Sequence, residues 1–510
     1  MSCVPGSDGA RYAIAKVVAF QYPVRHDECG LPQPAWPNQV YEEALPLADQ
    51  LGTPSHPLRV AVIGSGPAGF YATEELLKQE APLVAVDLFD RLPTPYGLVR
   101  GGVAPDHQKI KSVIKLYERT AQRPRFRFFG NVSYGDDLSL DDLKARYHQI
   151  LFCTGCETDN RMNIPGEDLP GSYPATIFVG WYNGHPDYRD LTFDLNVESV
   201  AVIGNGNVAM DVTRILAKPI GELGKTDIAT YALDELRNSR VREIHLLGRR
   251  GPAQAAFTNP EIRELGNIEG TDLVIRPEDL ELDPLSEEFL AGVKEPTHQR
   301  NVDIMRDFAT RGVGNQARKI LARFFVSPVE ILGDGKVEAL RIEKNKLVKD
   351  DKGNVRARGT GETEEFPVQM VFRSIGYRGT ALPDLPFDDW SGIIPNEGGR
   401  VRDPDADATV ARIYVAGWIK RGPSGVVGTN KPDAIATVRL MLEDAGAIGA
   451  DAAPLAAEDS TPALLEEKGV RFITFDDWKR LDALETEAGA KLGKPREKFT
   501  TVQEMVAALA

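Results

Sequence analysis

The sequence predicts an α/β protein that contains two similar strand-turn-helix units. Two glycine-rich turns lead to this prediction: Gly64-Ser65-Gly66-Pro67-Ala68-Gly69 and Gly204-Asn205-Gly206-Asn207-Val208-Ala209. Each turn directly follows a short apolar run, Val60–Ile63 or Val200–Ile203, and precedes a segment with helical periodicity. Glycines allow a tight turn and a close approach of the backbone to a pyrophosphate, which free amide groups at the helix N-terminus then hold. Each turn is therefore expected to open a Rossmann-like dinucleotide-binding domain.

The end of the next strand distinguishes the two nucleotides. A carboxylate there binds ribose hydroxyls, whereas a guanidinium pairs with a 2′-phosphate. The strand Val86–Phe89 leads to Asp90, which predicts an adenosine ribose such as that of FAD. The strand Ile244–Gly248 instead leads to Arg249 and Arg250, whose adjacent charges suit a dianionic phosphate. The second domain is therefore expected to bind NADP rather than NAD, and a solvated pair of loop charges is the alternative.

Three longer blocks carry a family resemblance. They are Pro93–His107, Gly248–Thr258 and Val415–Lys431, and they resemble the adrenodoxin reductase family of ferredoxin-NADP reductases, in particular its actinobacterial members. The resemblance runs nearly the whole length of the chain from about Pro57 onward. It implies a glutathione-reductase-like arrangement of two Rossmann-like domains, with an NADP-binding domain inserted in an FAD-binding domain. It also implies FAD and NADP(H) as cofactors.

The resemblance and the strand pattern together predict the domain boundaries. The FAD-binding domain is expected at residues 57–157 and 375–447, with the NADP-binding domain at 158–374 between its two parts. Residues 1–56 match no family block and are expected to form an arm, which either packs on the reductase surface or serves as a partner-docking or regulatory segment. Residues 448–510 are expected to form a linker and a helical extension.

Local patterns predict further elements of the inserted domain. Val326–Leu332 and the alternating segment Ala339–Ile342 are expected to be strands of its sheet, joined by the hairpin signal Gly333-Asp334-Gly335. Residues 218–240 form a long excursion between a helix and a strand. We expect a surface insertion there, with a helix near Tyr231–Arg237.

The C-terminal extension is expected to contain two helices. Trp478, Leu481 and Leu484 share a face of the first helix, which follows the cap-like residue Thr474. A capping box at residues 501–504, with threonine first and glutamate last, predicts the start of the second.

The resemblance also assigns binding residues beyond the turns themselves. For FAD the full set is Gly64, Gly66, Pro67, Ala68, Gly69, Asp90, Leu98, Val99, Thr154, Gly155, Trp418, Gly425, Val426 and Val427. For NADP it is Gly204, Asn205, Gly206, Asn207, Val208, Arg249, Arg250, Glu261 and Gly425. In this assignment Gly425 leaves space for the nicotinamide, and Glu261 orients the adenosine ribose or the arginine pair.

His107 and Glu264 are the candidate catalytic residues. They resemble family positions near the flavin and the nicotinamide, where they could steady a protonation state or orient the ring. Hydride transfer needs no protein acid at its central step, so a satisfied polar pair without a catalytic role is the alternative.

The four cysteines bear on the choice of electron acceptor. A cluster typically needs four thiolates, and Cys3 and Cys29 lie far apart in a polar, proline-rich segment, so the chain is expected to need an external iron-sulfur ferredoxin. Cys153 and Cys156 form a CxxC pair that leaves a thioredoxin-type disulfide reductase open as an alternative. Their place directly after the strand Gln149–Phe152 favours instead a turn that lines the flavin.

A basic stretch of the inserted domain is the candidate docking surface for that ferredoxin. An acidic chain that binds an acidic partner must concentrate its positive charge locally. The candidate residues are Arg263, Arg300, Arg306, Arg311, Arg318, Lys319 and Arg323. A solvated helix face is the alternative.

Composition limits the remaining possibilities. With 510 residues, of which 42% are hydrophobic, the chain can form more than one domain. A net charge of −15 argues against nucleic-acid binding. No apolar stretch approaches the roughly 20 residues of a membrane span. We expect a cytoplasmic protein without membrane insertion, and no metal site is predicted.

The expected function is therefore that of an NADPH-dependent ferredoxin reductase. Hydride passes from NADPH to FAD, and single electrons pass to an iron-sulfur ferredoxin that supplies a cytochrome P450 or a similar acceptor. The alternatives are a disulfide reductase that uses Cys153 and Cys156, and a non-catalytic flavin subunit of a larger complex. The sequence names neither the ferredoxin nor the oligomeric state.

Overall fold

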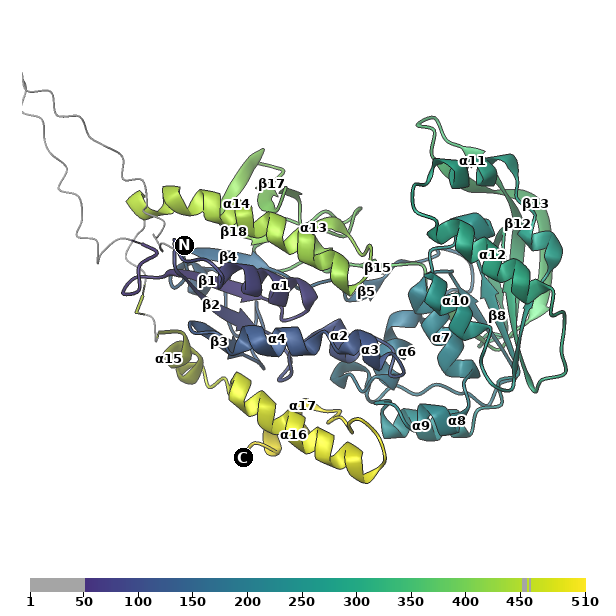
Figure 1. Cartoon of the computed structure of the whole chain (residues 1–510), viewed down its shortest axis with the longest axis horizontal. Coiled ribbons are helices and arrows are strands. Elements are labelled where there is room, and N and C mark those ends of the chain that lie inside the picture. The colour runs from purple at the N-terminus through teal and green to yellow at the C-terminus, as the bar shows by residue number, and fades with distance from the viewer. Residues whose placement is uncertain (1–50, 452–455, 458–459) are drawn as a thin grey trace, which may run out of the picture. The chain divides into compact units, whose positions relative to one another are not determined.

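A computed structural model describes residues 51–451, 456–457 and 460–510 (Figure 1). The N-terminal arm expected at residues 1–56 lies almost entirely outside these residues, as do Cys3 and Cys29. Within the described residues, the structure contains two large sheets and two small ones.

The first large sheet carries the first glycine turn. Its seven strands have the order β16-β17-β18-β4-β1-β2-β3, in which the core strands run parallel and β16, β17 and β18 form an antiparallel meander. The strands are β1 (Leu58–Ile63), β2 (Val84–Phe89), β3 (Phe126–Phe129), β4 (Gln149–Phe152), β16 (Asn396–Glu397), β17 (Arg400–Asp403) and β18 (Ala408–Val415). Segments on both sides of the second glycine turn in sequence therefore build this one sheet.

Helices cover both faces of the first sheet. On one face α1 and α14 lie side by side (Figure 1), and they share an apolar cluster with α4 and α16. The opposite face buries residues of α5, α13 and α15. The helices are α1 (Pro67–Leu76), α2 (Leu98–Gly101), α3 (Gln108–Lys111), α4 (Ile114–Ala121), α5 (Leu140–Lys144), α13 (Trp418–Arg421) and α14 (Asn430–Asp451).

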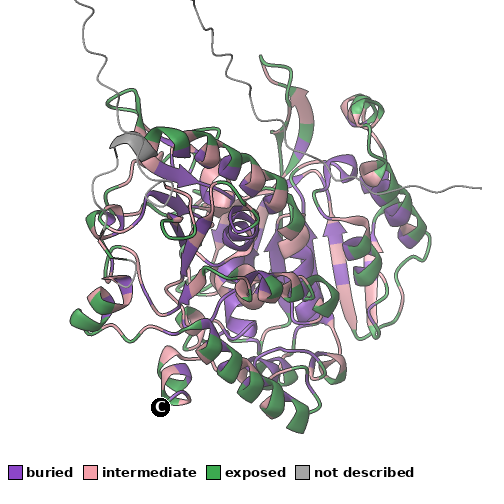
Figure 2. Cartoon of the chain, turned by 60° about the vertical axis from the view of Figure 1, so that its left-hand side comes forward, coloured by how far each residue is buried: buried purple, intermediate pink, exposed green. Residues whose placement is uncertain are grey.

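The second large sheet carries the second glycine turn. Its six strands are all parallel and have the order β6-β14-β7-β8-β10-β9. They are β6 (Ser172–Pro174), β7 (Ser199–Ile203), β8 (Glu243–Leu247), β9 (Thr271–Ile275), β10 (Arg318–Arg323) and β14 (Met370–Arg373). Parallel strands that are covered on both faces have continuous apolar sequences, and every residue of β7 is buried. Figure 2 shows strands in purple, the colour of buried residues, with green exposed residues mainly on helices and loops around them.

Helices and a small sheet cover the second sheet. The helices are α6 (Ala175–Tyr182), α7 (Asn207–Ala217), α8 (Ile220–Leu223), α9 (Thr230–Arg237), α10 (Asn259–Leu265), α11 (Pro284–Gly292) and α12 (Thr297–Ala309). Short 3-10 turns lie at Pro186–Tyr188, Pro252–Gln254, Pro277–Leu280 and, near the first sheet, Val427–Thr429. The helix expected near Tyr231–Arg237 is confirmed as α9.

The expected hairpin forms, but it does not join the sheet of the inserted domain. Strands β11 (Val326–Leu332), β12 (Ala339–Lys349) and β13 (Val355–Pro367) make a separate antiparallel sheet. Alternation gives β11 and β12 one apolar face, and this face packs against the second large sheet at residues such as Ala201 and Leu247. The small sheet is therefore a covering layer, and this part of the prediction was wrong.

Two short strands mark the crossings between the large sheets. The chain leaves the first sheet through β5 (Thr158–Asp159) and returns through β15 (Tyr377–Arg378), and the two strands pair antiparallel. One Rossmann-like unit is thus inserted in the other, as the sequence predicts.

The C-terminal segment forms three helices, α15 (Ser460–Glu467), α16 (Phe475–Lys491) and α17 (Val502–Ala507). Both predicted caps are confirmed, since Thr474 and Thr501 each form a capping box. The predicted apolar face is only partly correct: Trp478 and Leu481 are buried, but Leu484 is 40% exposed. Helix α15 was not predicted.

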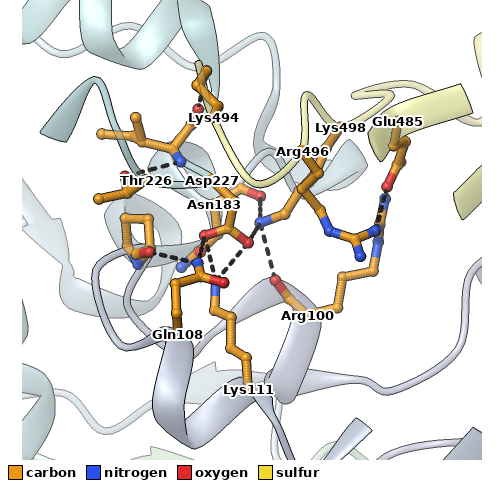
Figure 3. A network of polar contacts seen from close by, with 12 residues as sticks. Arg100, Gln108, Lys111, Asn183, Thr226, Asp227, Glu485, Lys494, Arg496 and Lys498 are labelled. Carbon is orange, nitrogen blue, oxygen red and sulfur yellow. Dashed lines mark hydrogen bonds and ion pairs between the residues drawn. The ribbon is translucent and has the colours of Figure 1, made fainter. Parts of the chain in front are cut away.

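A buried ionic network joins the C-terminal segment to both large units (Figure 3). Asp227, in the insertion between α8 and α9, accepts two hydrogen bonds of 2.8 Å from Lys111 of α3 and lies 3.2 Å from Lys498. Lys498 also donates to the carbonyls of Asn183 and Arg100. Residues that are far apart in sequence are therefore held together at one point.

Candidate dinucleotide and redox site

The three glycines of the first turn have different structural roles. Gly64 has a φ of +102°, and a Cβ added there would lie 2.6 Å from the carbonyl oxygen of Cys153. A Cβ on Gly69 would lie 2.0 Å from the oxygen of Gly64, so α1 packs tightly against the turn. A Cβ on Gly66 would meet nothing within 4 Å. Gly66 is the N-cap residue of α1, so this open space adjoins the helix N-terminus, where a diphosphate would bind.

Asp90 lies where the sequence predicts it, directly after β2. Its carboxylate accepts hydrogen bonds from the backbone N of Ser65 at 3.0 Å and from its Oγ at 2.5 Å. Burial raises the pKa of Asp90, although the hydrogen bonds from Ser65 and Leu92 oppose this shift. The carboxylate proposed for the ribose therefore also holds the glycine turn in place.

The second turn repeats the design of the first. Gly204 has a φ of +133°, and its added Cβ would lie 2.1 Å from the oxygen of Ser374, whereas Gly206 again has open space. Asn207 accepts a hydrogen bond from the backbone N of Thr258, and the carbonyl of Asn205 accepts one from Ala256. The turn is thus tied to the block at residues 248–258.

Arg249 and Arg250 lie at the end of β8, beside that turn. Arg249 is exposed and Arg250 is half-buried, and neither guanidinium forms a hydrogen bond or an ion pair with the residues the structure describes. Burial lowers the pKa of Arg250, and the nearby charges of Arg249 and Arg356 lower it further. The charges of Arg249 and Arg356 therefore act on Arg250, which has no anionic partner among the described residues, and a bound 2′-phosphate would supply one.

The block at residues 415–431 packs on the first turn. A Cβ on Gly417 would lie 2.6 Å from that of Ala68, and the backbone N of Gly417 donates to Asp433 at 2.6 Å. Trp418 donates through its indole to the carbonyl of Ser424 at 3.2 Å, which closes the loop. The loop proposed for the flavin is therefore in direct contact with the turn proposed for its diphosphate.

Gly425 is constrained by its own loop. It has a φ of +80°, and a Cβ there would lie 2.3 Å from Oγ1 of Thr429. Val426 next to it is 48% exposed, and Val427 begins a 3-10 turn. The glycine is thus required by the loop itself, whatever space it leaves for a nicotinamide.

The block at residues 93–107 approaches the first turn through Gly97. A Cβ on Gly97 would lie 2.9 Å from the Cα of Gly66. Leu98 is half-buried and available to a ligand, but Val99 is 0% exposed within the apolar cluster of the first sheet. Val99 therefore offers a flavin no accessible surface in this structure, because its side chain faces the core.

Thr154 and Gly155 are both half-buried at the end of β4. Gly155 has a φ of +79° and open space at its Cβ position. The flanking Cys153 and Cys156 are buried free thiols. Burial raises the pKa of both thiols, that of Cys156 to about 12, so neither is a ready nucleophile.

The candidate catalytic residues meet. Nε2 of His107 lies 2.9 Å from Oε2 of Glu264, which comes from α10 of the inserted unit. The other ring nitrogen of His107 lies 3.8 Å from carboxylate oxygens of Asp211 and Glu261. A cluster of titratable groups therefore lies where the two units meet.

Arg214 organises this cluster, and sequence reasoning missed it. Its guanidinium, 1% exposed, bonds Asp106 through two nitrogens at 2.8 and 3.0 Å, Glu261 at 2.8 Å and Asp211 at 2.6 Å. An arginine within an apolar stretch of α7 was the available signal. Glu261 thus pairs with Arg214 and not with Arg249 or Arg250, and its other predicted role, orienting the adenosine ribose, stays a prediction.

The protonation states follow from these contacts. Burial lowers the pKa of His107, but the hydrogen bond to Glu264 and the nearby carboxylates outweigh it and raise the pKa above the usual value. The hydrogen bond from His107 in turn lowers the pKa of Glu264. Burial and the adjacent Asp211 raise the pKa of Glu261 to about 7. The geometry therefore favours an ionised His107–Glu264 pair beside a carboxyl group that can hold a proton.

His107, Asp211 and Glu261 also have the spacing of metal ligands, with ligand atoms within 4.8 Å of one another. Arg214 already supplies a positive charge to the two carboxylates. The cluster is therefore compensated by the chain itself, and we assign no metal to it.

The basic residues proposed for docking are divided among several elements of the fold, and their role in docking stays a prediction. Arg300 and Arg306 lie on α12, whereas Arg318 and Lys319 begin β10 and Arg323 ends it. A six-residue strand places its ends about 17 Å apart. Arg323 is paired with Glu364 at 2.6 Å. The single basic stretch in sequence therefore corresponds to a helix, a loop and a strand in the fold.

Arg263 and Arg311 lie closer to the catalytic candidates. Arg263 is exposed on α10, next to Glu264, and Arg311 donates to the carbonyl of Gly266 just after that helix.

No helix among the described residues is long and apolar enough to cross a membrane.

Comparison with known proteins gives a consistent result. A sequence model of pyridine nucleotide-disulphide oxidoreductases matches residues 58–263. NADPH-ferredoxin reductase FprA of Mycobacterium leprae is 46% identical over 463 residues, covering 89% of this chain and 98% of that protein. The mitochondrial NADPH:adrenodoxin oxidoreductase of Arabidopsis thaliana is 41% identical over 468 residues, covering 89% and 96%. Mycobacterium tuberculosis FprA in complex with NADPH matches with a TM-score of 0.84 at 45% identity, over 89% of this chain and 100% of that one. The chain therefore belongs to the adrenodoxin reductase family of ferredoxin-NADP reductases.

Proposed function

We propose that the protein is an FAD-containing reductase that oxidises NADPH and passes electrons one at a time to an iron-sulfur ferredoxin. The observation that carries the proposal is the pair of glycine turns with open space at Gly66 and Gly206, the second lying beside two unpaired arginines. Bound FAD supplies the conversion between a two-electron donor and a one-electron acceptor. The relatives named NADPH-ferredoxin reductase support the choice of donor and acceptor.

The chain's own residues bind and orient the cofactors. The amide groups at the starts of α1 and α7 hold the two diphosphates, Asp90 binds a ribose of FAD, and Arg249 and Arg250 bind the 2′-phosphate of NADPH. The loop from Gly417 to Gly425 and residues 98, 154 and 155 contribute to the flavin pocket.

His107 and Glu264 position the reacting end of NADPH and fix a proton at the junction. Their hydrogen bond joins the two units, so it also fixes the position of the inserted unit relative to the flavin loop. A misplacement of about 1 Å at such a junction can cost a hundredfold in rate.

The ferredoxin docks against the Arg263 and Arg311 side of α10 in this proposal. These two cations are exposed and adjoin the helix that carries Glu264, so an acidic partner bound there is close to the junction. Arg323 contributes less, because Glu364 pairs with it at 2.6 Å, whereas the carboxylate of Asp307 lies 3.7 Å from Arg311. A cytochrome P450 as terminal acceptor and a cytoplasmic location stay predictions from the sequence.

Steady-state reduction of a ferredoxin by the purified holoenzyme tests the proposal. NADPH should support the reaction at a kcat/KM well above that of NADH, and the rate should fall steeply with ionic strength. Reduction of a small neutral dye should show little salt dependence. Equal rates with both coenzymes, or no ferredoxin reduction by an enzyme that reduces the dye, would reject it.

A disulfide reductase is the weaker candidate. Cys153 and Cys156 are buried and their pKa values are raised, so the thiolate that such chemistry needs is disfavoured. Alkylation of both thiols should leave ferredoxin reduction intact. The ferredoxin and dye reduction assays also distinguish a non-catalytic flavin subunit, because such a subunit would not oxidise NADPH on its own.

A further inference from the structure

The Arg249–Arg250 loop is held from one side by the three-stranded sheet. The side-chain amide of Asn345, on β12, donates to the carbonyl oxygen of Arg249 at 2.9 Å and to Oγ of Ser327 at 2.8 Å. Asn345 is 7% exposed, so these bonds are made away from bulk water. The sheet that was expected to extend the central sheet instead reaches the backbone of the arginine pair.

Phe325 completes the support. Its backbone N donates to the carbonyl of Arg250 at 3.1 Å, and its carbonyl accepts from the backbone N of Asn345 at 2.6 Å. Phe325 has a φ of +55°, a conformation that costs free energy in a non-glycine residue and therefore needs such contacts to hold it. A Cβ on Gly251 would lie 2.4 Å from its ring. Carbonyls of both arginines are thus fixed by one short chain of hydrogen bonds.

This support opposes a repulsion within the loop. Arg249 and Arg250 are adjacent cations, Arg356 of β13 adds a third positive charge, and no carboxylate among the described residues pairs with the first two. Arg356 itself bonds Asp350 at 3.0 Å. Without a fixed backbone the two unpaired guanidiniums would move apart, and the geometry for bidentate phosphate binding would be lost.

We propose that Asn345 is a positioning residue for coenzyme selection, which holds the backbone of Arg249 so that both guanidiniums face the 2′-phosphate of NADPH. The inference rests on the proposed function, because it requires the arginine pair to bind that phosphate. Asn345 touches neither coenzyme nor flavin in this arrangement. It acts through the carbonyl of Arg249, from the three-stranded sheet that covers the face of the second large sheet.

Calorimetric binding of 2′,5′-ADP and 5′-AMP to the flavin-loaded enzyme tests the inference without catalysis. Asn345→Leu keeps roughly the side-chain volume and removes both donors. We expect the affinity for 2′,5′-ADP to fall about tenfold, the effect of losing one positioned contact to a charged group, while that for 5′-AMP changes less than about twofold. Asn345→Ala carries the same test if leucine is not tolerated in the buried position.

Ser327→Ala is the matched control. It removes the other hydrogen bond of the same amide and leaves the bond to Arg249, so both affinities should stay within about twofold of the native values. Unchanged 2′,5′-ADP binding in both Asn345 variants, or equal weakening of both ligands, would overturn the inference.

The double variant R249A/R250A separates the inference from the proposed function. If it loses 2′,5′-ADP binding and the Asn345 variants do not, the arginines bind the phosphate and only the role of Asn345 is wrong. If it binds 2′,5′-ADP as tightly as the native enzyme, the proposed phosphate site is wrong, and the inference falls with it.

Discussion

Nε2 of His107 lies 2.9 Å from Oε2 of Glu264, although 157 positions separate the two residues in sequence. His107 is the last residue of the block that approaches the first glycine turn, and Glu264 lies on α10 of the inserted unit. The contact therefore joins the two dinucleotide-binding units, at the point where we propose that the nicotinamide and the flavin meet.

Replacing Glu264 by Gln should lower the pKa of His107, because the hydrogen-bonded carboxylate is the principal group that raises it. At a fixed pH near neutrality the imidazole would then be protonated less often. NMR titration of the His107 ring measures the shift. Glu269→Gln, which removes an exposed carboxylate shortly after the end of α10, is the control. A pKa that rises or stays constant in Glu264→Gln would contradict the electrostatic role assigned to the pair.

Replacing Arg249 and Arg250 singly by Ala should weaken NADPH binding by about one to two decades and leave NADH binding nearly unchanged. The reason is that each loses a charge-assisted contact to a group that NADH lacks. Fluorescence titration of the oxidised enzyme with both coenzymes gives the two dissociation constants. Arg242→Ala, an exposed cation at the other end of β8, should change neither. Equal losses for both coenzymes would show that the arginines do not read the phosphate.

Substitution by alanine should affect FAD binding at Gly66 and apoprotein stability at Gly69. A Cβ on Gly66 meets no protein atom within 4 Å, so Gly66→Ala should leave the apoprotein folded and lower the affinity for FAD by more than about tenfold. A Cβ on Gly69 lies 2.0 Å from the oxygen of Gly64, so Gly69→Ala should destabilise the apoprotein by about 1 to 3 kcal/mol. Flavin content and urea unfolding of the two apoproteins distinguish the effects. A flavin-replete Gly66→Ala enzyme would refute the assignment of the open space.

These glycines show how much the sequence determines. The spacing of the two turns, the apolar strands before them and the charged residues after the next strands were enough to place both Rossmann-like units. These are local patterns, and the backbone chemistry behind them leaves few alternatives. The insertion of one unit in the other came from the family resemblance.

Longer-range features were harder to predict. Arg214 lies inside an apolar stretch of α7, and of its partners only Asp211, three residues earlier on the same helix, is visible in the local sequence. Asp106 and Glu261 come from distant segments, and nothing near Arg214 in the sequence predicts them. Val99 belongs to a family block but faces the core, because a short helix turns it inward. The alternation in β11 and β12 predicts strands correctly, yet the pattern does not say whether a strand extends a sheet or covers its face.

Asp227 should contribute substantially to stability. Asp227→Asn leaves Lys111 and Lys498 buried without their carboxylate, so we expect the free energy of unfolding to fall by about 3 to 5 kcal/mol. Neighbouring lysines hold the pKa of Asp227 below its ordinary value, although burial opposes them, so its contribution is present above about pH 4 and is lost as the pH falls.

Urea unfolding across pH measures this effect, with Asp234→Asn as the control. Asp234 pairs with Arg237 on the exposed face of α9, and its loss should cost less than about 1 kcal/mol. A cost for Asp227→Asn no larger than that of the control would mean that the network in Figure 3 does not stabilise the junction.

Anaerobic single-turnover reduction of the purified yellow enzyme tests the central claim most directly. The account predicts that the protein carries FAD and that added oxidised ferredoxin restores the colour after reduction. It also predicts that NADPH bleaches the flavin absorbance at least about tenfold more efficiently than NADH, which is the effect expected from one charge-assisted contact to the 2′-phosphate. A colourless protein that takes up no FAD, or equal bleaching by the two coenzymes, would contradict it.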